Sequence, residues 1–268
     1  MVLRKHDENK LQVAIFPLPG MVAFEGQQHL LHVFEPRYRK MVDDCVENKW
    51  MLGLALPRKR ISTVDNSGKS FQEILNSNQS TYEAHDVLGA GSVRILRTLP
   101  DGRVLVMVNI HHRVRIKDMT QTLPYFLAEV ELSDVEPLPR KRVRYYFDQL
   151  LAISKSILGE KYRLFEEKIP DIIFQNYDLQ ALMLKVMDWF RLESDLLQQL
   201  LEQPSLEERV SSFLDYMYSY LAQEDPELYE SQVPAVNPFP EDGEAPGKLI
   251  EVDFTHKRSK DHPDVSDS

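Results

Sequence analysis

The hydrophobic pattern of this chain changes its period once, at about Pro139. Before that point apolar residues recur at every second position, most clearly over residues 104–116, and after it they recur every three or four residues, as over 143–158. Alternation is typical of a strand with two different faces, whereas a 3.6-residue period makes an amphipathic helix. The sequence therefore predicts an α+β chain, with a β-rich domain over residues 1–138 and a helical bundle over 139–230.

Short strand patterns follow one another through the first part. They cover residues 11–16, 29–34, 51–56, 90–99, 104–116 and 125–132, and an apolar stripe over 38–46 predicts one early helix that starts at Pro36. We expect Pro57 to close the third strand, and the polar residues 58–80 to form a long surface loop. Asn109 tolerates the left-handed region, so a hairpin or a bulge is expected near it. Strands of this spacing predict a small barrel or a folded sheet.

Four helices are predicted behind the strands. They are expected over 143–158 with a stop at Gly159, over 179–190, from Ser194 to before Pro204, and from a capping box formed by Ser205 and Glu208. Residues 231–268 then turn rich in Pro, Asp, Glu and Gly, so we expect a disordered tail. One interruption of the tail, residues 249–254 (LIEVDF), has the pattern of a strand.

Charge and composition limit the partners and the compartment. The net charge is −10, spread as 18 basic and 17 acidic groups over residues 1–140 but 10 and 17 over 141–230. Nucleic acid is therefore a disfavoured partner, and the basic residues 94–117 are expected to form a solvated sheet face. No run approaches the ~20 apolar residues of a membrane span, and the first ten residues do not resemble a secretory signal. A single cysteine, Cys45, fits a reducing compartment, so we expect a cytoplasmic protein.

The chemical motifs of the chain are incomplete. Gly68-Lys69-Ser70 lacks the Gly five residues earlier that a phosphate loop needs. His29 and His32 should point to opposite faces of their strand, and one cysteine cannot build a zinc cluster. Cys45 lies on the apolar side of its helix, and Ser154 and Lys155 diverge as helix neighbours. We therefore expect no catalytic residue, no metal site and no cofactor, and a chain that is not an enzyme.

Several segments resemble the N-terminal domain of the Lon proteases. They include residues 16–20 (FPLPG), the corner Phe34-Glu35-Pro36-Arg37-Tyr38, residues 89–95 and residues 206–210, and the resemblance covers about 10–222. It implies a PUA-like β-barrel in front of a helical bundle, a role in recognising substrate polypeptides and in oligomer assembly, and no catalytic residues. The Lon ATPase and protease domains would need several hundred further residues, so we expect a stand-alone substrate-binding protein. Asn109, where the family often has Gly, and the long 58–80 segment depart from the family pattern.

Two groups of residues are singled out for function. The Pro-fixed apolar loop would lose little entropy on binding a polypeptide, and its candidate contacts are Phe16, Pro17, Leu18, Met21 and Phe24. Packing of these side chains into the core is the competing interpretation of each. We expect the corner of Phe34, Glu35, Pro36, Arg37 and Tyr38 to be structural. Unfolded or partly folded polypeptides are the expected partners. A protease, a chaperone and a second copy of the chain are further candidate partners that the sequence leaves open. An RNA-binding PUA-like protein is the alternative.

Overall fold

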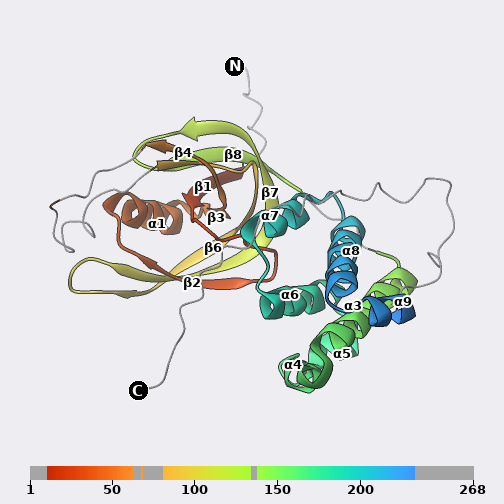
Figure 1. Cartoon of the computed structure of the whole chain (residues 1–268). Helices are drawn as coiled ribbons and strands as arrows, with labels where there is room; N and C mark the ends of the chain where they lie inside the picture. Colours follow the sequence, from red (N-terminus) through yellow and green to blue (C-terminus); the bar gives the residue numbers. More distant parts are fainter. Residues whose placement is uncertain (1–10, 63–67, 69–80, 134–137, 233–268) are drawn as a thin grey trace, which may run out of the picture.

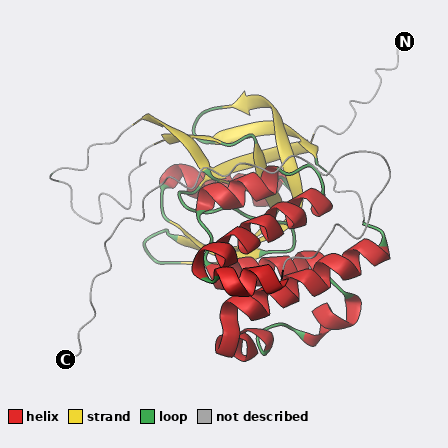
Figure 2. Ribbon diagram, turned by 45° about the vertical axis from the view of Figure 1, so that its right-hand side comes forward, coloured by secondary structure: helices red, strands yellow, loops and turns green. Residues whose placement is uncertain are grey.

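The computed structural model describes residues 11–62, 68, 81–133 and 138–232 (Figure 1). Strands dominate up to residue 132, and helices follow from residue 140. The expected α+β architecture is confirmed, with strands at one side and the later helices at the other. Figure 2 shows the helices gathered below the strands. The Gly68-Lys69-Ser70 motif lies outside the described residues except for Gly68, as does the tail from residue 233.

Six strands form one sheet, in the order β2-β7-β6-β3-β1-β8, and β8 also pairs with β7. The strands β7, β6, β3, β1 and β8 thus close into a ring, and β2 is added outside it along β7. Their bounds are β1 (Leu11–Pro17), β2 (Gln28–Val33), β3 (Met51–Ala55), β6 (Val87–Thr98), β7 (Val104–Gln121) and β8 (Phe126–Leu132). Only β1 and β3 are parallel to each other, while the other pairs are antiparallel.

The long strand β7 pairs with three strands, β2, β6 and β8, and it has a bulge opposite β6. Gly91 of β6 pairs with Ile110 and Ala90 pairs with His112, so His111 is the extra residue. Of the hairpin or bulge expected near Asn109, the structure contains the bulge. A Cβ on Gly91 would overlap the carbonyl oxygen of Asn109, so only glycine allows this close approach.

Residues 58–62 differ from the expectation of a surface loop over 58–80. With Pro57 they form the strand β4 (Pro57–Ser62), which pairs with β5 (Thr81–Ala84) in a separate two-stranded sheet. Pro57 therefore begins a strand rather than closing one. Its ring costs little there because the first position of a short strand needs no donated hydrogen bond.

Helix α1 (Pro36–Asn48) and the sheet share one apolar core. Met41, Val42 and Cys45 of α1 pack with Phe16 and with the inward side of β7. A second core, which includes Val13, Leu88 and Val114, lies on the other face of the strands. Successive side chains of β1 point to opposite faces of the sheet, so alternate residues of this strand belong to the two different cores.

The helical part contains more helices than the sequence predicts. It consists of α3 (Arg140–Leu158), η1 (Gly159–Lys161), α4 (Tyr162–Glu166), α5 (Asp171–Asn176), α6 (Leu179–Phe190), α7 (Ser194–Glu202), α8 (Leu206–Glu224) and α9 (Pro226–Gln232). The short helices α4, α5 and α9 were not expected, because segments of five to seven residues carry too few turns to show a period. No helix in the described part of the chain is long and apolar enough to cross a membrane.

The helices pack directly against the strands. The core of the bundle also contains Val22, Phe24, Leu56 and Val87 from the β-rich part. Arg113 of β7 was expected on a solvated sheet face, but its residue is only 3% exposed. Its guanidinium donates to the carbonyl oxygens of Leu201, Gln203 and Pro204 at the end of α7, which corrects that expectation.

Candidate functional site

The loop that was predicted to bind polypeptide is partly buried. Phe16 is 7% exposed and its ring lies 4.3 Å from that of Tyr38, and Pro17 is also buried as the last residue of β1. Phe24 is 1% exposed and packs into the core of the bundle. The expectation that these three side chains are accessible therefore needs correction. Leu18 and Met21 remain half-buried, and their role in binding stays a prediction.

The corner before α1 is built around an ion pair. Arg37 Nη2 lies 2.9 Å from Glu35 Oε2, and both residues are buried. The Arg37 guanidinium carbon also lies 4.5 Å from the ring centroid of Tyr38, whose side chain packs into the core with Phe16. Phe34 and Pro36 are half-buried beside them. The contacts described here join the corner residues to one another and to the core.

The most exposed large apolar side chain in the six-stranded sheet is Leu30 of β2. This strand is the edge of its sheet and pairs with β7 alone among the described strands. Its sequence, QHLLHV, contains no Lys, Asp, Glu or Pro. Edge strands usually carry charge or proline because an unprotected edge pairs with other chains. The edge of β2 lacks both of these protections.

The backbone of β2 has hydrogen-bonding groups to offer at this edge. Ile110 N–H donates to the carbonyl oxygen of Gln27 at 2.9 Å, which fixes the alternation between bonded and non-bonded positions along the β2–β7 pair. By that alternation His29, Leu31 and Val33 bond to β7. The N–H and C=O groups of Gln28, Leu30 and His32 consequently point away from β7, to the free edge.

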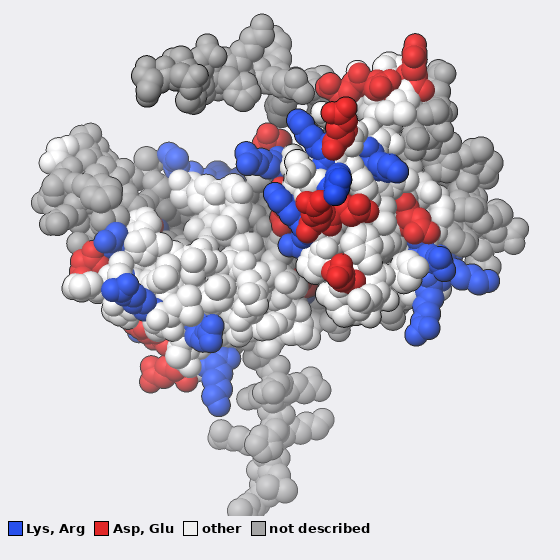
Figure 3. Space-filling model, turned by 90° about the horizontal axis from the view of Figure 1, so that it is seen from below, with Lys and Arg blue, Asp and Glu red and all other residues white. Residues whose placement is uncertain are grey.

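The outer face beside this edge is apolar at its centre. Leu30 is 58% exposed and lies opposite Met107 of β7, which in turn lies opposite Arg94 of β6. The next rung joins His32 to Leu105 and Arg97. Leu96, displaced by a second bulge in β6, is 42% exposed. Viewed from below, the strand half of the molecule presents a broad surface without charge, while charges crowd the helical half (Figure 3).

His29 contributes no charge to the edge at neutral pH. Burial lowers the pKa of its imidazole below the ordinary value of 6.5, and the nearby carboxylate of Asp188 on α6 only partly opposes this. Its Nε2 atom is buried without a hydrogen-bond partner in the described structure. Burial therefore keeps the imidazole neutral beside Leu30.

Other reactive groups in the described residues are placed for packing. Burial raises the pKa of the Cys45 thiol to about 12, so it is protonated and a weak nucleophile. Ser154 is buried whereas Lys155 is exposed, so they do not form a pair. No three His, Cys, Asp or Glu side chains of the described ranges gather as metal ligands. His29 is half-buried and His32 exposed, in agreement with their expected divergence.

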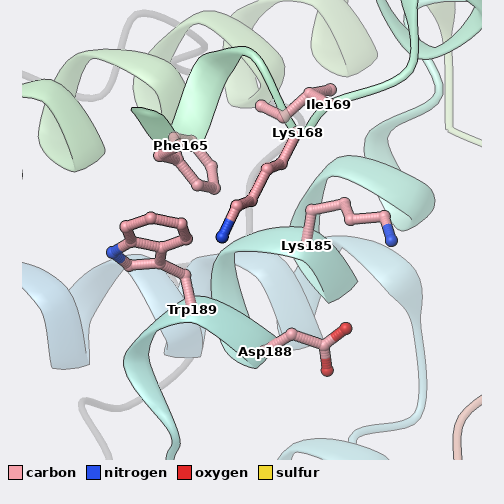
Figure 4. A pocket seen from close by; sticks show the side chains of 6 residues that line it. All are labelled: Phe165, Lys168, Ile169, Lys185, Asp188 and Trp189. Atoms are coloured by element: carbon pink, nitrogen blue, oxygen red, sulfur yellow. The ribbon is translucent and has the colours of Figure 1, made fainter. Parts of the chain in front are cut away.

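One pocket of about 240 Å³ lies among the helices, lined by Phe165, Lys168, Ile169, Lys185, Asp188 and Trp189 (Figure 4). The Lys168 ammonium points at the Trp189 ring, 4.8 Å from its centroid, while Lys185 and Asp188 point away from it. The cation already has an aromatic partner, and both lysines are exposed. We therefore assign this pocket a packing role and regard the β2 edge as the candidate site.

Comparison with known proteins gives one consistent family. The sequence model of one protein family, described as the ATP-dependent protease La (LON) substrate-binding domain, matches residues 12–219 of this chain. The Lon protease of Parabacteroides distasonis is 25% identical over 163 residues, which are 60% of this chain and 18% of that protein. Lon protease 1 of Herpetosiphon aurantiacus is 20% identical over 205 residues, which are 74% of this chain and 23% of that protein. The chain thus spans about a fifth of the length of these relatives.

Among solved structures, the N-terminal domain of the Mycobacterium avium complex Lon protease has the same fold. It superposes with a TM-score of 0.51 at 12% identity, over 78% of this chain and all of that domain.

Proposed function

Because the chain belongs to the LON substrate-binding domain family, we propose that it binds extended, unfolded polypeptides by strand addition to the free edge of β2. The observation that supports this most is the edge itself. It exposes the Leu30 side chain and the backbone N–H and C=O groups of Gln28, Leu30 and His32, and β2 contains no Lys, Asp or Glu. An added strand would satisfy those groups, and its side chains would reach the apolar rungs of Leu30–Met107 and His32–Leu105.

The preferred polypeptide follows from the chemistry of the surface. Main-chain hydrogen bonds carry no sequence preference, whereas Leu30 of β2, backed by Met107 of β7, favours a segment with apolar side chains at alternate positions. Folded proteins seldom expose such a segment, so unfolded and partly folded chains are the proposed partners. The proposed activity is binding without bond cleavage.

A titration with a labelled unfolded protein tests this proposal. The probe is a fluorescein-labelled protein whose cysteines are reduced and alkylated so that it cannot refold, and its anisotropy reports binding to the full chain. We expect Leu30→Lys to weaken binding roughly tenfold, because the ammonium must lose water when a strand covers it. The matched control is Leu164→Lys on α4, since Leu164 and Leu30 are both 58% exposed. It should bind like the wild type.

Three results would contradict the proposal. Equal binding by the two lysine variants would remove the β2 edge as the site. Tight binding of a mixed-sequence single-stranded RNA that weakens steeply with salt, beside no binding of the polypeptide, would favour the RNA-binding alternative. Fragmentation of the probe during the titration, if it follows the chain through size-exclusion chromatography, would show that binding is not the whole activity.

A further inference from the structure

We propose that residues 249–254 of this same chain pair with the free edge of β2 as an added strand and so compete with other polypeptides for it. This inference rests on the proposed function of that edge and specifies its regulation. The segment belongs to the tail beyond α9, outside the described residues.

The sequence of this segment fits the requirements of the edge. Ile250, Val252 and Phe254 share one parity, while Glu251 and Asp253 share the other, which is the pattern of a half-buried strand. Prolines occur at 246 and 263 but not between them, so each residue there can donate a backbone hydrogen bond. The tail contains no other run with this alternation.

The apolar side chains of such a strand could lie on either face of the sheet, because β2 has an apolar residue on each. Leu30 offers an apolar contact on the outer face, and Leu31, half-buried, offers one on the inner face. The two carboxylates of the segment meet no carboxylate on β2, because β2 contains no Asp or Glu. Arg94 and Arg97 lie on the outer face two strands away, whereas the Asp188 carboxylate of α6 lies near His29. Charge therefore favours an acidic segment that turns its carboxylates to the outer face.

The tail is long enough to reach the edge. Sixteen residues, 233–248, separate the end of α9 at Gln232 from Leu249. Extended, they span roughly 55 Å at ~3.4 Å per residue. A folded body of about 220 residues is on the order of 45 Å across, so a linker that runs over its surface reaches most of that surface, though not the point directly opposite its start.

Linkage through the chain makes this competition effective. A segment tethered by a short linker has an effective concentration on the order of millimolar at its target. Even a weakly pairing segment would then occupy the edge much of the time. The apparent affinity of the edge for a polypeptide from another chain would fall in proportion to the fraction of molecules whose edge is free. A polypeptide with several matching segments, or with a longer apolar strand, would displace the tail.

Proline substitutions in the full chain test this inference. Glu251→Pro and Val252→Pro each remove one donor from the centre of the segment, and because the two positions differ in parity, one of these donors faces β2 in any added strand. Val236→Pro makes the same kind of change elsewhere in the tail as a matched control. Two quantities are measured: the affinity for the labelled unfolded protein, and the hydrogen–deuterium exchange of the peptide containing residues 28–33 without any added polypeptide. We expect whichever of Glu251→Pro and Val252→Pro removes a donor that faces β2 to bind the probe at least about threefold more tightly and to exchange faster over 28–33. Val236→Pro should match the wild type in both.

The outcomes separate this inference from the proposed function. If Leu30→Lys weakens probe binding while neither Glu251→Pro nor Val252→Pro changes affinity or exchange, the tail does not occupy the edge and the proposed function stands. If Glu251→Pro or Val252→Pro speeds exchange over 28–33 but no variant binds the probe, the tail occupies the edge and the proposed function falls. Equal effects of Val236→Pro and of the more effective of these two variants on both quantities would also overturn the inference, because the pairing would not involve residues 249–254.

Discussion

Arg209 of α8 is fully buried where the helices meet the strands. Its Nη1 lies 3.2 Å from Glu25 Oε2, its Nε donates to the Leu200 carbonyl oxygen at 3.1 Å, and its guanidinium carbon lies 5.5 Å from the Phe24 ring centroid. The three contacts join one side chain to the loop before β2 and to α7. They hold this loop, and with it the start of the candidate edge, against the bundle.

Replacing Arg209 should strongly lower the free energy of unfolding. Arg209→Met leaves the largely buried Glu25 carboxylate without its partner and removes one of the two donors to the Leu200 carbonyl oxygen, and breaking a buried pair costs about 3–5 kcal/mol. Urea unfolding followed by circular dichroism measures the change. The control is Arg163→Met, whose pair with Glu167 is exposed and contributes about 1 kcal/mol or less. A loss below about 1 kcal/mol in Arg209→Met would show that the junction does not depend on this pair.

At the scale of elements, the strands with clear alternation and the long helices were predicted from the sequence with small errors at their ends. The pattern failed where a few residues decide the structure. Residues 58–62 look like polar loop because both faces of β4 are largely exposed, and His111 bulges because Gly91 lets two backbones touch. Local periodicity contains no information about either contact.

The candidate site could be predicted only in part, for a related reason. The apolar residues Phe16 and Phe24 suggested a surface loop, but the helices cover Phe24, and only the packing of distant segments reveals this. Strand β2 was predicted, whereas its position at the edge depends on the order of strands in the sheet. The sequence of β2 gave no signal for this position, because QHLLHV lacks charge and proline and so has the pattern of a central strand.

The start of α8 offers a test of an element that was predicted from its capping box. Ser205 Oγ accepts a hydrogen bond from Glu208 N–H at 3.1 Å, and Ser205 is the N-cap. Ser205→Ala should reduce the free energy of unfolding by about 1 kcal/mol, because the N–H loses its acceptor. Ser219→Ala within the same helix should leave stability unchanged or slightly higher, since alanine is the better helix former. Equal effects of both substitutions in urea unfolding would contradict the capping role.

At the scale of the whole molecule, we propose that the β-rich part and the helical part, divided near residue 138, unfold as one unit. Val22, Phe24, Leu56 and Val87 of the first part belong to the core of the second, and Arg113 reaches across to α7. Neither part keeps this core when they separate, so partial unfolding would expose apolar surface on both.

The two tryptophans make this cooperativity measurable. Trp50 lies beside α1 in the β-rich part, and Trp189 lies on α6. Trp189→Phe leaves a reporter for the strands, and Trp50→Phe leaves one for the helices. In urea, the fluorescence transition of each variant should coincide with its own transition by circular dichroism. Two separated transitions within one variant would show that the parts unfold independently.

Backbone methylation of a bound peptide tests strand addition at β2 most directly. A labelled apolar peptide that binds the chain is synthesised in two forms, each with N-methyl groups on three alternate residues, one form for each parity. A strand added to an edge presents the N–H groups of one parity to β2, so one form should lose about tenfold or more in affinity while the other binds like the parent peptide. Leu30→Lys should remove this difference by weakening the parent and the tolerated form alike. If both methylated forms bind the wild-type chain as well as the parent does, the peptide is not bound as a strand, and the account of this edge is wrong.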